Sequence, residues 1–330
     1  MLPVMAVRTA AEAGFFSRIV WVFPSSSSVE QLQLDVFVTQ MLGSFSMTED
    51  EAANLTLEDG SLRGMIAGVP FQAVHPEALP SLDQPVVVHF DLTYMKPGYK
   101  GEIKTPLYPQ LLDTLDGLKS TGWKTTTVTI SFSNLEGEIP LPSRFVARDL
   151  AAVFANPALL AEEPPRQWQL RTNALYIENF FKKEEVRKLY EEMTAADPSD
   201  ASVKYALYNV ARQFKEGDAA LDYLQQAVEL DPVYALEYLT LAETALKGKR
   251  PDKAIDMLQN ARAKLPNNSF ILLSLVRLAI DSHRQDLALQ LLPLLQGETW
   301  STIYHPDITE EIWNLDKRAR EAQQAPVHEK

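Results

Sequence analysis

Asp91 ends a run of valines in the segment HFDLTYMKP (89–97), just before a proline turn. A strand that delivers an aspartate to a sheet edge can place a ligand for a divalent metal ion. A metal ion that activates water needs about three protein ligands and one open position. His89 shares a face with Asp91 on a strand. Since a lone histidine among valines is more often a hydrogen-bonded core residue than a ligand, Asp91 is the one candidate metal ligand.

Other catalytic groups have no recognisable motif in the sequence. The chain contains no cysteine, which excludes disulfides, thiolate metal sites and cysteine nucleophiles. It also lacks a glycine-rich phosphate loop, a G-x-S-x-G nucleophile elbow and an H-E-x-x-H zinc helix. We therefore predict no active site in the chain as it stands, with Asp91 as a vestigial ligand.

The composition is that of a two-domain globular protein. The chain has 330 residues, of which 46% are hydrophobic and 23% charged. No apolar stretch is long enough to span a bilayer. The net charge of -13 argues against a nucleic-acid partner, which would need a basic face. Arg8, Glu12 and Arg18 interrupt the N-terminal segment where a secretory signal needs an unbroken apolar core, so we predict a cytoplasmic protein.

Strands and helices alternate in the first half of the chain. β-Branched and aromatic runs predict strands, and amphipathic segments between them predict helices. The expected elements are a strand at 17–24, a helix at 25–42, a hairpin or two short strands within 61–76, a buried parallel strand at 84–97, a helix at 105–122, a strand at 124–134 and a helix at 142–157. This order predicts an α/β domain over residues 1–157, whose parallel or mixed sheet has its faces covered by helices, and a linker at 158–166.

The stretch VHFDLTYMKPGYKGEIKTP (88–106) resembles the second metal-binding strand of the arginase- and deacetylase-like hydrolases, in a bacterial branch. The resemblance covers residues 1–157 and implies one or two metal ions, held by an Asp-x-Asp pair on this strand and an Asp-x-His-x-Asp set on an earlier one. Here the pair is Asp91 and Thr93, and the earlier set is absent. The resemblance therefore implies a degenerate domain, or one whose first strand precedes Met1. We expect no cofactor, and Zn or Mn only if the missing ligands lie upstream of Met1.

The second half of the chain has a period of 34 residues. Pro198, Pro232 and Pro266 are spaced by that interval, and small and large residues recur at fixed offsets between them. The prolines define windows at 167–200, 201–234 and 235–268, with a weaker fourth window from 269. Each window predicts two helices joined by a short turn, as in a stack of helical hairpins.

The repeats resemble the tetratricopeptide repeat (TPR), which has a W-x2-L-G-x2-Y, A-x3-F and terminal proline pattern. The best copy carries Tyr238, Leu241, Ala242, Ala245, Ala254, Leu258, Ala261 and Pro266 at the matching offsets. The resemblance covers about residues 167–302 and implies an all-α TPR solenoid over 167–324. A polar amphipathic helix within 305–324 would cap the solenoid, and 325–330 would form a tail. The resemblance also implies a concave groove that binds a protein or peptide.

Seven side chains are expected in this groove from the family's geometry: Tyr205, Asn209, Arg212, Leu239, Glu243, Leu273 and Arg277. Two interpretations of them remain open. Tyr205, Leu239 and Leu273 share one offset and could instead pack between neighbouring helices, and the charged residues could simply be solvated. Because Tyr205 occupies the place of a carboxylate-clamping lysine, the resemblance disfavours a C-terminal carboxylate as ligand.

Three functions are compatible with these features. The one we favour is an interaction scaffold that uses the repeat groove and carries an inactive α/β domain. The alternatives are a metal-dependent amide or amidine hydrolase with a partner-recruiting repeat domain, and a self-association module that forms homo-oligomers.

Overall fold

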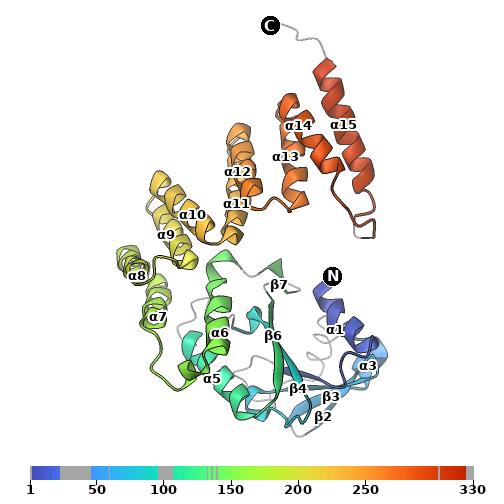
Figure 1. Ribbon diagram of the computed structural model, residues 1–330, viewed down its shortest axis with the longest axis vertical. Helices are drawn as coiled ribbons and strands as arrows, with labels where there is room; N and C mark the ends of the chain where they lie inside the picture. The colour runs from blue at the N-terminus through green and yellow to red at the C-terminus, as the bar shows by residue number, and fades with distance from the viewer. Residues whose placement is uncertain are drawn as a thin grey trace. The chain divides into compact units, whose positions relative to one another are not determined.

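The computed structural model forms two compact units, Met1–Pro198 (unit 1) and Ser199–Lys330 (unit 2) (Figure 1). The structure describes residues 2–22, 46–58, 60–95, 107–131, 133–134, 137–138, 140–303 and 305–324. The expected helix at 25–42 and the expected tail lie outside these residues. Each unit is described by itself.

Unit 1 contains a four-stranded sheet in the order β1-β4-β3-β2. Its strands are β1 (Ile19–Val22), β2 (Thr56–Glu58), β3 (Ser61–Ile66) and β4 (Val69–Val74). Strands β3 and β4 form the hairpin expected within 61–76, and they pair antiparallel. Both turn residues, Ala67 and Gly68, have positive φ, which suits a two-residue hairpin turn. Strand β1 pairs with β4 in parallel, so the sheet is mixed.

Two short helices, α1 (Leu2–Glu12) and α3 (Glu49–Ala53), accompany this sheet. Thr48 and Glu51 form a reciprocal capping box at the start of α3. The Glu51 carboxylate also accepts hydrogen bonds from Arg8 Nη1 at 2.7 Å and from the Ala67 backbone N–H at 2.7 Å. One carboxylate thus connects α1, α3 and the β3–β4 turn.

A second, parallel strand pair joins β5 (Val86–Asp91) to β6 (Thr125–Ser131). Helices α5 (Leu107–Ser120) and α6 (Phe145–Ala155) pack on one face of the pair, where Phe90 is buried with Leu111 and Leu150. On the opposite face Val87 is 50% exposed and His89 is exposed. The expectation of a strand buried on both faces is therefore wrong for β5, because its side chains alternate between a covered and an open face.

Within the described residues, the strands of unit 1 form three separate small sheets, the third being β7 (Ser133–Asn134) paired with β8 (Gly137–Glu138). The single α/β sheet with covered faces that the sequence predicts is not seen in this part of the chain. The arginase-like architecture is accordingly not seen there either.

The boundary between the units lies further along the chain than the expected linker. The helical hairpin α7 (Arg166–Glu178) and α8 (Lys183–Ala196) belongs to unit 1. Trp168 of α7 is buried in the same cluster as α5 and α6, and its ring stacks on Tyr108 with centroids 4.8 Å apart. Leu159 and Leu160, inside the expected linker, pack against this cluster too. Burial of these side chains joins the first repeat window to the preceding α/β elements.

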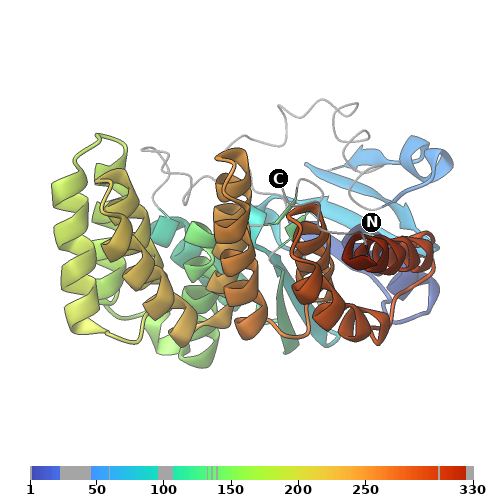
Figure 2. The same ribbon diagram turned by 90° about the horizontal axis from the view of Figure 1, so that it is seen from above.

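Unit 2 is an array of helical hairpins that lie side by side in chain order (Figures 1 and 2). The helices are α9 (Ala201–Gln213), α10 (Gly217–Leu230), α11 (Glu237–Lys247), α12 (Pro251–Lys264), α13 (Ser269–Asp281), α14 (Gln285–Gln296) and α15 (Ile308–Gln324), with a 3-10 turn at Pro232–Leu236 before α11. These bounds confirm the helix pairs expected for windows 201–234, 235–268 and the fourth window, and the closing helix. None of the helices in the described ranges is long and apolar enough to cross a membrane.

The backbone repeats the 34-residue period of the sequence. The turn inside each helix pair contains one residue with positive φ, and these are Phe181, Lys215, Lys249 and His283. The second helices α8, α10 and α12 end at Ala196, Leu230 and Lys264. Each end stands two residues before one of the three periodic prolines, which disfavour a helical conformation at the preceding residue.

The core of unit 2 repeats with the same interval. Ala211, Ala245 and Ala279 on the first helices are at most 5% exposed, and Ala220, Ala254 and Ala288 on the second helices at most 3%. Small side chains at these positions let paired helices approach closely, while Leu224, Leu258 and Leu292 fill the space between them. The offsets that carry the repeat resemblance are therefore core positions.

Candidate protein-binding site between α13 and α15

The expected groove residues Tyr205 and Arg212 belong to an internal hydrogen-bond network. The carboxylate of Glu237, at the start of α11, accepts hydrogen bonds from the hydroxyls of Tyr205 and Tyr208, each at 2.7 Å. Arg212 Nη1 donates to the same carboxylate at 3.0 Å and to the Tyr208 hydroxyl at 3.0 Å. Tyr205 also stacks on Tyr234 with centroids 4.7 Å apart. These contacts fix α9 against α11.

Burial keeps the tyrosine hydroxyls of this network protonated. Burial, together with the hydrogen bond to Glu237, raises the pKa of Tyr205 and of Tyr208 far above the ordinary value, so both hydroxyls stay protonated as donors. Tyr205 is 3% exposed, which favours the packing interpretation for this residue. Arg212 has a structural partner in Glu237, so its substitution would disturb the fold as well as any surface it lines.

Three further expected residues lie at or near the core. Leu273 is 3% exposed and belongs to a hydrophobic cluster of unit 2, and Leu239 is partly buried against that cluster. Asn209 is partly buried, and its side-chain amide donates to the Tyr205 carbonyl at 3.2 Å. Arg212, Glu243 and Arg277, in contrast, are exposed. Of the seven residues, these three are the ones that a partner could contact.

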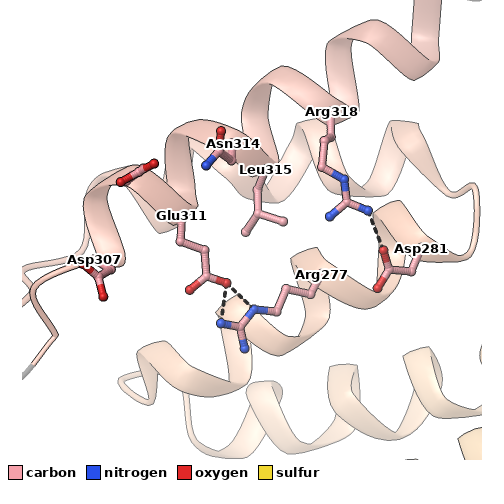
Figure 3. A pocket seen from close by; sticks show the side chains of 8 residues that line it. Arg277, Asp281, Asp307, Glu311, Asn314, Leu315 and Arg318 are labelled. Atoms are coloured by element: carbon pink, nitrogen blue, oxygen red, sulfur yellow. Dashed lines mark hydrogen bonds and ion pairs between the residues drawn. The ribbon is translucent and has the colours of Figure 1, made fainter.

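Arg277 lines a pocket of about 380 Å³ between α13 and α15, here called the α13–α15 pocket (Figure 3). Its lining residues are Arg277, Asp281, Asp307, Glu310, Glu311, Asn314, Leu315 and Arg318. The Leu315 side chain is 3% exposed and lies between the charged groups, as Figure 3 shows. The pocket therefore has a charged rim around a buried leucine.

Two ion pairs of opposite polarity connect α13 and α15 across the pocket (Figure 3). Arg277 of α13 pairs with Glu311 of α15, and Arg318 of α15 pairs with Asp281 of α13 at 2.7 Å. Both pairs are partly exposed, so each contributes at most about 1 kcal/mol to stability. Ile308, Ile312, Leu315 and Ala319, all buried, account for most of the adhesion of α15.

The rim contains an excess of negative charge. Each of the two guanidinium groups already has a carboxylate partner. Within the described residues, the carboxylates of Asp307 and Glu310 make no hydrogen bond or ion pair and remain uncompensated. A side chain that ends in a cation suits such a pocket, because its head can meet the carboxylates.

Sequence reasoning missed most of this pocket because it assigned α15 to capping alone. The repeat interval offered a signal, since Glu311 follows Arg277 by 34 residues, as Arg277 follows Glu243. Continuing the groove offsets into α15 would have placed Glu311 beside Arg277. The periodicity therefore extends through the first turns of α15.

The candidate metal ligand Asp91 lies at the carboxyl end of β5, opposite Ser131 of β6, and is partly buried. His89 is hydrogen-bonded to Thr129 Oγ1 at 2.8 Å on the open face of the strand pair, rather than in the core. The described part of the chain brings together no group of three or more histidine, aspartate or glutamate side chains that could hold a metal ion. The position of Asp91 therefore gives no support to the hydrolase alternative.

No protein-family model and no curated protein matches this chain. Among solved structures, MamA is similar at 18% identity over 56% of this chain and 95% of its own, with a TM-score of 0.28. YrrB, described as a TPR protein with an unusual peptide-binding site, is similar at 16% identity over 54% of this chain and 92% of its own, with a TM-score of 0.28. The APC/C hetero-tetramer Cut9-Hcn1 covers 70% of this chain and 41% of its own, at 15% identity and a TM-score of 0.28.

Proposed function

We propose that unit 2 is a protein-interaction module that binds a segment of a partner protein, with a lysine or arginine side chain of that segment in the α13–α15 pocket. The observation that carries the proposal is the pair of uncompensated carboxylates, Asp307 and Glu310, in the lining of this pocket. The cationic head of a basic side chain would compensate these carboxylates.

One further groove position contributes a carboxylate. Glu243 of α11 shares its repeat offset with Arg277 and Glu311, is exposed, and makes no ion pair within the described residues. A segment that contacts successive first helices would thus meet Glu243 before it reaches the α13–α15 pocket. Binding along such a repeat surface uses several weak anchors in series, so affinity depends on their sum.

The test uses fluorescein-labelled peptides that differ only at one position, occupied by lysine, arginine, norleucine or glutamate. Binding to the full chain is measured by fluorescence anisotropy. We expect the lysine and arginine peptides to bind at least about tenfold more tightly than the norleucine peptide, as one charge-assisted contact supplies. Equal binding of all four peptides would contradict the proposal.

Two substitutions should act in opposite directions. Asp307→Asn removes an attracting charge while keeping the size of the side chain, and should weaken binding of the lysine peptide. Arg277→Gln removes a competing cation and should tighten it. A general loss of structure cannot produce both signs. Asp256→Asn, an equal charge change at an exposed position on the second helix α12, serves as the matched control and should leave binding unchanged.

A further inference from the structure

Helix α15 packs on α13 and α14 as the first helix of a further pair would, and the described residues contain no helix after it. In the three preceding pairs the first helix carries Ala211, Ala245 or Ala279 at one offset, each covered and at most 5% exposed. The same offset in α15 is Trp313, which is 61% exposed. A large aromatic side chain thus stands on the face where each earlier repeat buries an alanine.

Oppositely charged residues flank Trp313 along α15. Glu310 lies one turn before Trp313, and Lys317 lies one turn after it, with its ammonium 5.6 Å from the indole ring centroid. Glu310 has no ion-pair partner within the described residues, while Lys317 Nζ lies 3.9 Å from Glu321. Both side chains are exposed. Trp313 therefore has an acidic side chain one turn before it and a basic side chain one turn after it.

Such a face is complementary to itself when two copies pair in opposite directions. We propose that the Trp313 face of α15 packs against the same face of a second copy of this chain, antiparallel about a twofold axis at Trp313 and Asn314. Glu310 of one copy then lies opposite Lys317 of the other, twice in the dimer, because the two residues stand almost equally far from the axis. The two indole rings cover each other at the centre, where an aromatic anchor contributes most.

The size of this interface sets the expected affinity. A helix of 17 residues is about 25 Å long, and one such helix pair falls at the small end of protein interfaces. We therefore expect a weak dimer, with a dissociation constant of roughly 10 to 100 µM. Sedimentation of the full chain should show a monomer far below this range and a dimer far above it. A monomer throughout would overturn the proposal.

Charge exchange identifies the interface. Glu310→Lys and Lys317→Glu should each weaken the dimer at least about tenfold, because like charges then face each other twice. An equimolar mixture of the two variants should regain dimerisation, since every pair across the mixed interface is again opposite in sign. Failure of the mixture to recover would exclude this antiparallel arrangement. Glu191→Lys and Lys253→Glu, at exposed helix positions elsewhere, are the controls and should leave the dimer unchanged.

Trp313→Ala tests the apolar centre, and should abolish dimerisation at all accessible concentrations while circular dichroism and the melting temperature stay close to those of the parent. A dimer that survives this change would place the contact elsewhere. The outcome is separable from peptide binding, because neither Trp313 nor Lys317 lines the α13–α15 pocket. Monomeric Trp313→Ala and Lys317→Glu chains should still bind the lysine peptide.

Discussion

Glu237 shows how a single carboxylate can be structural in a region that resembles a binding groove. Its side chain is 7% exposed and is satisfied by two tyrosine hydroxyls and one guanidinium group. Replacing it with alanine leaves both buried hydroxyls without their acceptor, and should lower the free energy of unfolding by about 3 kcal/mol. Arg212→Ala leaves those two hydrogen bonds in place and should cost about 1 to 2 kcal/mol.

Urea unfolding of the parent, Glu237→Ala and Arg212→Ala chains checks this order of stabilities. A larger loss for Arg212→Ala than for Glu237→Ala would mean that Arg212, not the carboxylate, is the centre of the network. The sequence offset placed Tyr205 and Arg212 on the right helix. The offset could not identify Glu237 as their shared partner, because Glu237 belongs to the next repeat. A pattern of residue types also does not distinguish a buried tyrosine from a solvated groove residue.

Glu51 should make unit 1 sensitive to acid. Desolvation alone would raise the pKa of its carboxyl, but hydrogen bonds from Arg8 and from the backbone N–H groups of Thr48 and Ala67 outweigh it and lower the pKa from 4.5 to about 2. The unfolded chain therefore binds this proton more readily than the folded chain does. The stabilisation by Glu51 is fully present above about pH 4.5 and is lost as the pH falls towards 2.

The measurement is urea unfolding of the parent and of Glu51→Gln at a series of pH values. The difference in stability between them should shrink as the pH falls through this window. Glu163→Gln, at an exposed position, should show no such convergence. A difference that stays constant with pH would contradict the assignment of the acid sensitivity to Glu51.

At the scale of elements, the helix pairs turn through a strained residue. Lys215 joins α9 to α10 with φ of 62°, a conformation that costs a residue with a Cβ atom about 1 kcal/mol and costs glycine little. Lys215→Gly should therefore raise the free energy of unfolding of unit 2 by up to about 1 kcal/mol. Gln259→Gly, at an exposed position in the interior of α12, should lower it by about the same amount. Thermal unfolding checks both, and a loss of stability for Lys215→Gly would contradict the role of backbone strain.

The helical elements could be predicted because local chemistry determines their ends. The prolines that follow α8, α10 and α12 disfavour helical conformation at the residue before them, whatever the tertiary context. Strand β5 had no comparable signal. Its valines are equally compatible with a strand buried on both faces and with one that exposes Val87 at 50%, so the open face could not be predicted from the residues.

At the scale of the whole molecule, the division into units depends on contacts distant in sequence. Trp168 stacks on Tyr108, and this contact brings the first helix pair into unit 1. A proline-rich segment between the two residues is typical of a linker, and composition alone cannot show that the chain after it returns to the same core. The 34-residue repeat of turn residues includes the turn between α7 and α8, so the repeat does not mark the boundary between the units.

The central claim is that the α13–α15 pocket receives a basic side chain of a partner. Its most direct test is hydrogen exchange of the full Trp313→Ala chain, in which α15 does not pair with a second copy, with and without a saturating lysine peptide. We expect slower amide exchange in α13 and α15, and loss of this protection in the additional variant Asp307→Asn. Unchanged exchange in both helices at saturation, or protection confined to the sheets of unit 1, would contradict it.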